Sequence, residues 1–168
     1  MEIKSTFKNK SGQTLDVVYN DIESELDFKD KDIYSAKAYC FYKDKLVIVY
    51  SKSKGYWAPP GGGVEKGESV RDTVIREVKE ETNMKVVKQR FIGIQDIFEP
   101  QKTITQTRSA CIVEPYADFT HDLDGGEITE IKLIDPKDYK KYFDWGVVGD
   151  RLMERALEAK KQIELGLN

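Results

Sequence analysis

The amino-acid sequence predicts an α+β fold, organised as an α/β/α sandwich in which helices cover a mixed β-sheet. Stretches rich in aromatic and β-branched residues, which favour strands, occupy most of the chain. A central segment and a terminal segment instead repeat apolar residues at helical spacing. Because 168 residues suffice for one hydrophobic core, we expect residues 1–168 to form a single domain.

The first part of the chain is predicted to form two β-hairpins. The paired strands flank short turn-like segments, Asn9–Gln13 and Lys43–Lys45. The polar stretch Asn20–Lys31 and the Gly- and Pro-rich segment Ser51–Gly67 are expected to be loops. The predicted strands are Ser5–Phe7, Leu15–Tyr19, Ile33–Tyr42 and Leu46–Tyr50.

A helix is predicted to begin at Val70, because apolar residues recur from there at three- and four-residue intervals. Ser69, with Asp72 three residues later, has the pattern of a helix N-cap. The elements expected downstream are strands at Phe91–Phe98, Ile104–Val113 and Ile128–Ile134, a polar stretch at Glu114–Gly126, a short helix at Asp135–Tyr142 and a terminal helix from about Val148 to near Gly166.

The composition argues against several classes of protein. Thirty acidic and 27 basic residues give a net charge of −3, so a nucleic-acid-binding surface is not indicated. No apolar run approaches the roughly 20 residues that a membrane helix needs, and Met1–Lys10 lacks the apolar region of a secretory signal. We therefore expect a cytoplasmic protein in which Cys40 and Cys111 are buried free thiols, with a lone disulfide as the alternative.

Three glutamates of the predicted central helix point to a cation. Glu77, Glu80 and Glu81 stand at positions i, i+3 and i+4, so they share one helical face. Like charges at this spacing cost roughly 0.2–0.5 kcal/mol per pair, and the helix dipole disfavours anions near the C-terminus. A divalent cation reverses that balance, because Mg²⁺ prefers carboxylate oxygens. The alternative is a solvated outer face, on which Arg76 and Lys79 soften the repulsion.

The loop ahead of this helix is suited to a ligand. Pro59–Gly63 is built from proline and glycine, which permit tight turns and close approach of the backbone to a bound molecule. It lacks the GxxxxGK[ST] and GxGxxG patterns of other phosphate-binding loops. Glu68 lies just before the helix, so we expect the folded loop to bring it near the carboxylate face. An ordinary surface loop is the alternative.

Together these residues resemble the signature of the Nudix hydrolase family, G-x5-E-x7-R-E-U-x-E-E-x-G-U, in which U is a bulky aliphatic residue. One position departs, because Asn83 stands where the family has its last Gly. That Gly resembles a helix C-cap in the left-handed conformation, for which Asn is the usual second choice, so we expect the substitution to be tolerated. The residues on the pattern are Gly62, Glu68, Arg76, Glu77, Val78, Glu80, Glu81 and Met84.

The resemblance implies a Nudix-type sandwich and hydrolysis of a diphosphate linkage with Mg²⁺, or with Mn²⁺ as a substitute. The implied metal ligands are Gly62, Glu68, Glu77, Glu80 and Glu81. Glu77, Glu80 and Glu81 are also the implied catalytic residues, while Arg76 would have a structural role and orient a neighbouring carboxylate. One more carboxylate is expected downstream, where Glu127 or Glu130 would serve as general base or extra ligand, with an exposed strand residue as the alternative.

The expected substrate is a small nucleotide-like molecule, such as ADP-ribose or a nucleoside triphosphate. Pro100, sixteen residues beyond Met84, resembles a feature of the ADP-ribose-cleaving branch, although a plain hairpin turn would show the same proline. Arg108, Trp57, Phe98 and Tyr56 are candidate substrate contacts, with core or surface packing as the alternative. A homodimer is implied by resemblance alone, and neither nucleic acid nor a membrane is expected as a partner.

Two other functions remain open. The first is a Nudix-fold nucleotide-binding or sensor domain without hydrolysis, but such domains usually lose carboxylates of the signature, and this chain has all of them. The second is the diphosphate isomerase branch of the fold, which relies on additional His ligands and a catalytic Cys. A single histidine, His121, makes that branch a poor match.

Overall fold

The computed structural model describes residues 1–118 and 127–167 of the chain. His121 and part of the polar stretch Glu114–Gly126 lie outside the described residues. The strands are β1 (Glu2–Lys8), β2 (Thr14–Asp21), β3 (Ser35–Tyr42), β4 (Lys45–Ser51), β5 (Tyr56–Ala58), β6 (Gly61–Gly63), β7 (Met84–Phe98), β8 (Thr103–Pro115) and β9 (Ile128–Ile134). The helices are η1 (Glu25–Phe28), α1 (Val70–Thr82), η2 (Pro136–Lys141) and α2 (Gly146–Glu164).

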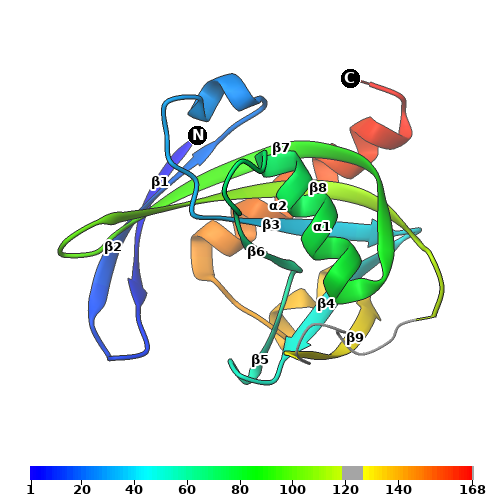
Figure 1. Ribbon diagram of the computed structural model, residues 1–168, viewed down its shortest axis with the longest axis horizontal. Coiled ribbons are helices and arrows are strands. Elements are labelled where there is room, and N and C mark those ends of the chain that lie inside the picture. The colour runs from blue at the N-terminus through cyan, green and yellow to red at the C-terminus, as the bar shows by residue number, and fades with distance from the viewer. Residues whose placement is uncertain (119–126, 168) are drawn as a thin grey trace.

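A mixed β-sheet forms the middle layer of the molecule (Figure 1). Its strands run in the order β1-β2-β7-β8-β3-β4-β5, with β6 beside β3 and β9 beside β4. The β3–β8 pair is parallel, whereas the other pairs of the described sheet are antiparallel. Helices α1 and α2 lie on opposite faces of the sheet, which confirms the predicted sandwich.

Strand β3 shows why the sheet carries a helix on each face. Successive side chains of a strand point to opposite faces. Ala38 and Cys40 belong to the core beneath α1, together with Val78. Tyr39 belongs to the core beneath α2, together with Leu152. The apolar stripes of both helices are therefore buried, and β3 is fixed at the centre of the sandwich.

The structure extends the sequence-based prediction in three places. Strand β7 begins at Met84 rather than at Phe91. The sequence did not reveal its first half, because exposed lysines and bulges there interrupt the alternation of polar and apolar residues. The predicted loop Ser51–Gly67 contains the short strands β5 and β6, which pair with β4 and β3. The predicted loop Asn20–Lys31 contains the single turn η1, capped by the hydroxyl of Ser24.

The end of α1 confirms the expected left-handed cap. Asn83 has φ 55° and ψ 36°, and its backbone N–H donates to the carbonyl of Lys79 at 2.9 Å. The side-chain amide of Asn83 also donates to the carbonyl of Asp118 at 3.0 Å, which a glycine could not do.

Cys40 and Cys111 are buried and free, as predicted. Among the described helices, none has the length and apolar character needed to span a membrane.

Candidate active site

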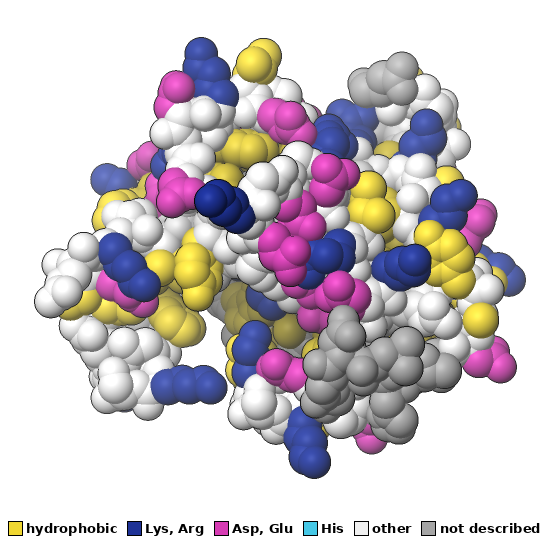
Figure 2. All heavy atoms as spheres, in the orientation of Figure 1, with side chains coloured by type: hydrophobic (Ala, Val, Ile, Leu, Met, Phe, Trp, Pro, Cys, Tyr) yellow, Lys and Arg dark blue, Asp and Glu magenta, His cyan; other side chains and the backbone are white. Residues whose placement is uncertain are grey.

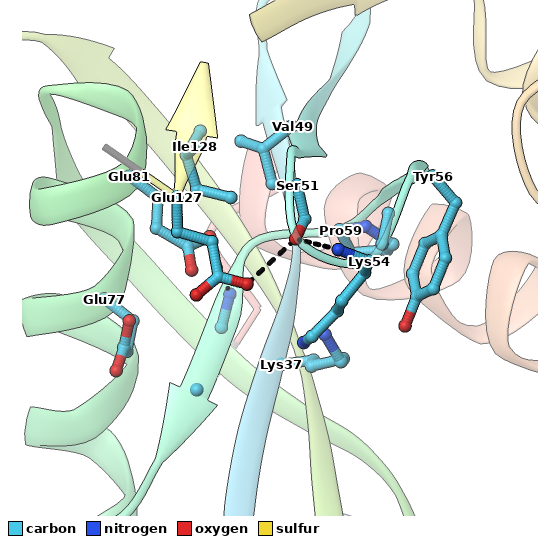
Figure 3. A pocket seen from close by; sticks show the side chains of 13 residues that line it. Lys37, Val49, Ser51, Lys54, Tyr56, Pro59, Glu77, Glu81, Glu127 and Ile128 are labelled. Carbon is cyan, nitrogen blue, oxygen red and sulfur yellow. Dashed lines mark hydrogen bonds between the residues drawn. The ribbon is translucent and has the colours of Figure 1, made fainter. Parts of the chain in front are cut away.

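A cavity of about 240 Å³ opens between α1, the β5–β6 segment and the beginning of β9. Its walls differ in charge, as Figure 3 shows. Glu77, Glu81 and Glu127 line one side, and Lys37 and Lys54 line the other. In Figure 2, acidic side chains gather over α1 beside a hollow in which basic side chains are visible. The cavity therefore pairs an anionic wall with a cationic one.

Helix α1 directs two carboxylates toward this cavity, because its N-cap and its buried face fix how the helix lies on the sheet. The hydroxyl of Ser69 accepts a hydrogen bond from the backbone N–H of Asp72 at 3.1 Å, which fixes the start of the helix. Val78 is fully buried against the sheet and sets the rotation of the helix. Glu77 and Glu81, one turn apart, then both face the cavity.

Glu80 lies beside these two carboxylates rather than between them. At 100° per residue, Glu80 is turned away from Glu81 by more than a quarter of the helix circumference. Its side chain is 37% exposed and lies 3.3 Å from Nη1 of Arg76. The three glutamates of the signature therefore share a broad face of α1, but the cavity is lined by Glu77 and Glu81.

Arg76 links the helix to the loop that precedes it. Its Nε and Nη2 donate to the two carboxylate oxygens of Glu68, at 2.7 and 3.0 Å. Its Nη1 donates to Glu77 at 2.8 Å, and Nη2 also donates to the carbonyl of Gly63 at 2.9 Å. These bonds to Arg76, helped by the hydroxyl of Thr73, lower the pKa of Glu68 to about 2. The guanidinium thus fixes both the loop and a cavity carboxylate.

Glu81 is the most perturbed carboxylate of the cavity. Burial is the main cause that raises its pKa to about 8, and the neighbouring charge of Glu77 adds to it. The ammonium of Lys37 and a hydrogen bond from the backbone N–H of Gly61, at 3.2 Å, act in the opposite direction. A half-buried carboxylate next to a second one is stabilised in its charged form by a cation.

Two glycines make room for this arrangement. A Cβ atom on Gly62 would lie 2.3 Å from a carboxylate oxygen of Glu77, so the backbone of the loop touches the cavity carboxylate directly. Gly61 has φ 152°, and a Cβ there would lie 2.2 Å from the carbonyl oxygen of Ala36. The loop therefore needs glycine at one position for the carboxylate and at the other for strand pairing.

The donor chemistry of the site fits a hard divalent cation. Within residues 1–118 and 127–167, no three His, Cys, Asp or Glu side chains are already gathered into a metal site. The reason is visible in the contacts, because Arg76 holds Glu77 and the N–H of Gly61 holds Glu81. Glu77, Glu81 and the Gly62 backbone nevertheless offer oxygen atoms alone at one wall of the cavity, which is the ligand type that Mg²⁺ prefers.

The structure separates the two downstream carboxylates. Glu127 lines the cavity and accepts hydrogen bonds from the hydroxyls of Ser51 and Ser53, at 2.9 and 2.6 Å. The two serine hydroxyls lower the pKa of Glu127, so its side chain stays ionised. Glu130 is exposed on β9 opposite Tyr50 and does not line the cavity. Of the two alternatives, Glu127 is therefore the one placed at the site.

Three of the four candidate substrate contacts are absent from the lining of this cavity. Arg108 is 3% exposed, and it donates to the carbonyl of Thr107 and to Gln106, at 3.0 and 2.9 Å. The ring of Trp57 packs between aromatic side chains and Lys132, against the core beneath α2. Phe98 is exposed at the end of β7 and is absent from the cavity lining. Burial or absence from the lining thus argues against Arg108, Trp57 and Phe98 as direct contacts there.

The cavity also uses two lysines, Lys37 and Lys54, that the sequence did not single out as site residues. Lys37 is a charged residue inside the otherwise buried strand β3, a signal that was available in the sequence. Burial first, and then the positive charges of Arg108 and Lys54, lower the pKa of Lys37 to about 8. Tyr56, one of the candidate substrate contacts, also lines the cavity and is 45% exposed.

A protein-family model covers the whole site, and curated relatives match shorter segments of the chain. A family model of the NUDIX domain matches residues 35–155. The Nudix hydrolase YvcI of Bacillus subtilis, described as uncharacterized, is 43% identical over 51 residues, which cover 30% of this chain and 32% of the relative. An ADP-ribose pyrophosphatase of Methanocaldococcus jannaschii is 39% identical over 54 residues, again 30% of this chain and 32% of the relative. The matched segments thus span about a third of these curated relatives.

Solved structures resemble the whole fold. The Bacillus subtilis pyrophosphohydrolase BsRppH (E68A mutant) has a TM-score of 0.66 at 19% identity, over 92% of this chain and 97% of that one. The NUDIX domain of Shewanella oneidensis NrtR, solved with ADP ribose, has a TM-score of 0.60 at 15% identity, over 81% and 98%. Nudix hydrolases generally use divalent metal ions. Because the domain match covers residues 35–155, this chain belongs to the Nudix family.

Proposed function

We propose that this protein is a pyrophosphohydrolase that uses Mg²⁺, or Mn²⁺ in its place, to hydrolyse the diphosphate linkage of a nucleoside diphosphate derivative. One observation carries the proposal. Glu77 and Glu81 face a common cavity from one helix, and burial raises the pKa of Glu81 to about 8. Such a site is stabilised by a cation, and a diphosphate is the ligand that shares cations with clustered carboxylates.

The residues of the site divide the work as follows. Glu77 and Glu81 hold the cation together with the backbone of Gly62, and Glu80 extends the same face of α1. Glu68 acts through Arg76, since both of its oxygens are bonded to that guanidinium. When bound, Mg²⁺ neutralises phosphate charge and lowers the pKa of an attacking water. The protein supplies mainly orientation and charge, as in other phosphoryl transfers.

Glu127 is assigned to the cation rather than to proton transfer. The hydroxyls of Ser51 and Ser53 hold its carboxylate toward the cavity and lower its pKa. A general base works best when its pKa lies near the working pH, whereas a cation ligand works best when it stays ionised. The hydrogen bonds of Glu127 therefore favour the role of an additional ligand.

The relatives support this class of reaction. The Methanocaldococcus jannaschii relative is named an ADP-ribose pyrophosphatase, and the Bacillus subtilis structure is named a pyrophosphohydrolase. Both names describe cleavage of a phosphate anhydride. The cavity agrees with that chemistry, because it places oxygen ligands opposite two lysines.

The experiment is a panel of hydrolysis assays with the purified protein. ADP-ribose, dinucleoside polyphosphates, nucleoside triphosphates and oxidised guanine nucleotides are each incubated with Mg²⁺, with Mn²⁺ and with chelator, and the products are resolved by chromatography. We expect metal-dependent release of a mononucleotide from at least one compound, and loss of that activity in Glu81→Gln with the fold retained. Turnover that survives chelation, or a Glu81→Gln variant that loses activity only because it unfolds, would contradict the assignment.

The same panel tests the non-catalytic alternative. The NUDIX domain of NrtR was solved with ADP ribose, so a domain of this fold binds such a ligand. If calorimetry detects binding of ADP-ribose while no compound is hydrolysed under any condition, the protein is a binding or sensor domain. The retained carboxylates Glu77, Glu80 and Glu81 favour hydrolysis instead.

A further inference from the structure

Lys37 is a cation in the middle of the sandwich, and the carboxylates of Glu81 and Glu77 act on it without a direct ion pair. It lies on β3, where its backbone faces Gly61 of β6 on one side and Arg108 of β8 on the other. The residue is half-buried and lines the cavity. Its ammonium group makes no ion pair or side-chain hydrogen bond with the residues that the structure describes. A buried charge is costly unless an opposite charge compensates it, so Lys37 needs another anion once a cation occupies the carboxylates of Glu77 and Glu81.

Lys54 brings a second ammonium group to the same part of the cavity. It lies in the turn between β4 and β5, where its backbone N–H donates to the hydroxyl of Ser51 at 3.2 Å. Ser51 in turn donates to Glu127 at 2.9 Å, so this turn is tied to the cavity. Figure 3 shows the side chains of Lys54 and Lys37 extending toward each other, across the cavity from Glu77. Two like charges that converge repel each other unless an anion lies between them.

The cleaved diphosphate does not account for both lysines. In the proposed function, the phosphates of that linkage share the cations held by Glu77 and Glu81. Those cations also neutralise the carboxylate wall, which leaves Lys37 and Lys54 as uncompensated positive charges. An ammonium binds a further phosphate through charge-assisted hydrogen bonds, but it gains much less from the hydroxyl groups of a sugar.

We propose that Lys37 and Lys54 bind a phosphate group beyond the cleaved linkage, so that the site favours substrates with three or more consecutive phosphates over diphosphate-linked sugars. This inference rests on the proposed function, because it assumes that the carboxylate wall binds the linkage that is cleaved. Lys37 and Lys54 are thereby specificity-determining residues. The substrate class is a nucleoside 5′-triphosphate or a dinucleoside polyphosphate.

The test compares ATP with ADP-ribose as substrates, because they share the base and differ beyond the diphosphate. Lys37→Met and Lys54→Met keep an unbranched side chain that is one atom shorter, and they remove its charge. We expect the KM for ATP to rise about tenfold or more in each variant, the size of one charge-assisted hydrogen bond. The KM for ADP-ribose should change less than about twofold, and Lys37→Arg should restore most of the affinity for ATP.

Lys52→Met is the matched control. Lys52 lies in the same turn as Lys54, but its side chain does not line the cavity. The control should leave both KM values unchanged, and thermal unfolding should show that every variant is folded. Equal losses for ATP and ADP-ribose in Lys37→Met, or no loss for either, would overturn the proposal.

A separate measurement distinguishes this inference from the proposed function. If no compound is hydrolysed, the proposed function fails, and calorimetry with inorganic tripolyphosphate and Mg²⁺ then decides the inference. Tighter binding by the wild-type protein than by Lys37→Met supports a phosphate site at the lysine pair. Equal binding by the two proteins overturns it.

Discussion

At the scale of single residues, the adjacent glycines Gly61 and Gly62 make room for different neighbours. A Cβ on Gly62 meets the flexible end of Glu77, at 2.3 Å, whereas a Cβ on Gly61 meets the backbone of Ala36, at 2.2 Å. A side-chain carboxylate can rotate away, but the backbone of a central strand cannot. A side chain at position 62 should therefore affect mainly the activity of the site, and a side chain at position 61 should affect mainly the stability of the fold.

The first prediction compares Gly62→Ala with Gly61→Ala. Gly62→Ala should displace Glu77 and lower kcat by about tenfold or more, since misplacing a catalytic group by about 1 Å is costly. Its free energy of unfolding should change by less than about 1 kcal/mol. Gly61→Ala should destabilise the fold by several times that amount, because φ at Gly61 also disfavours a side chain. Urea titration and steady-state kinetics provide both values, and equal destabilisation by the two variants would refute this division.

The second prediction concerns Glu127. If this carboxylate is a cation ligand, Glu127→Gln should raise the Mg²⁺ concentration that gives half-maximal activity, while kcat at saturating Mg²⁺ falls less than about tenfold. A general base would behave differently, with a loss of about 10²–10⁴-fold in kcat at every Mg²⁺ concentration. Ser53→Ala removes the bond at 2.6 Å and should reproduce a weaker form of the same shift. The measurement is a Mg²⁺ titration of the hydrolysis rate.

The candidate site shows which residues a sequence can identify. Glu77, Glu81 and Gly62 belong to one local segment, so their spacing alone placed them together. Trp57 and Arg108 could not be placed in this way, because their surroundings depend on strand pairings between segments far apart in the chain. A residue type suggests what a side chain can bind, but the sheet decides which face it occupies.

At the scale of elements, α1 was predictable because its signals are local. Ser69 caps its start, and Asn83 ends it in the left-handed conformation. The first half of β7 was not predictable, because Lys85 and Lys88 are exposed there and the register shifts at Val86. Such a strand is specified by the neighbouring strand β8 rather than by its own alternation of polar and apolar residues.

The third prediction concerns the end of α1. Asn83→Gly should keep the cap and change the free energy of unfolding by less than about 1 kcal/mol. Glycine adopts the left-handed conformation more easily than asparagine, but it cannot make the hydrogen bond to Asp118. Asn83→Ala should cost about 1–2 kcal/mol, since alanine disfavours φ 55° and cannot make that bond. Urea unfolding of the three proteins gives the order. A more stable alanine variant than glycine variant would show that the cap is not maintained.

The fourth prediction concerns the attachment of α2 to β2. The guanidinium of Arg151 donates to both carboxylate oxygens of Asp21, at 2.6 and 3.2 Å, and the hydroxyl of Tyr19 donates to the same group at 3.0 Å. Burial raises the pKa of Asp21, but these hydrogen bonds outweigh burial and the net pKa is lowered. A carboxylate with a lowered pKa in the folded state stabilises the protein above its unfolded pKa.

Asp21→Asn should therefore destabilise the protein by about 1–3 kcal/mol at neutral pH, because it removes one of the two carboxylates paired with the partly buried guanidinium of Arg151 and leaves Glu154 as the other. The difference between wild type and variant should shrink as the pH falls through the lowered pKa of Asp21, since wild-type Asp21 then becomes neutral too. Urea titrations at several pH values measure that difference. A difference that stays constant down to strongly acidic pH would show that the interaction is not ionic.

At the scale of the whole molecule, the sheet brings the site together from distant segments. Glu77 and Glu81 come from α1, Lys37 comes from β3, and Glu127 directly precedes β9. Strand β3 lies at the centre because it pairs with β4, β6 and β8. Because Lys37 and the carboxylates of Glu77 and Glu81 share this cavity, ligands that complete its charge balance should stabilise the fold. Binding and stability should therefore be coupled in this protein.

The fifth prediction tests that coupling. Burial raises the pKa of Glu81, so the folded protein without metal holds a carboxylate that is poorly stabilised in its charged form. A cation that binds the folded state alone adds RT ln(1 + [Mg²⁺]/Kd) to the free energy of unfolding, about 1.4 kcal/mol at ten times Kd. Wild-type Tm should therefore rise steadily with Mg²⁺.

In Glu81→Gln the metal-free Tm should match or exceed that of the wild type, because a buried carboxylate has become neutral. The rise of Tm with Mg²⁺ should be lost in this variant. Thermal scans with NaCl at matched ionic strength separate site binding from general screening. An equal Mg²⁺ response in the two proteins would place the cation away from Glu81.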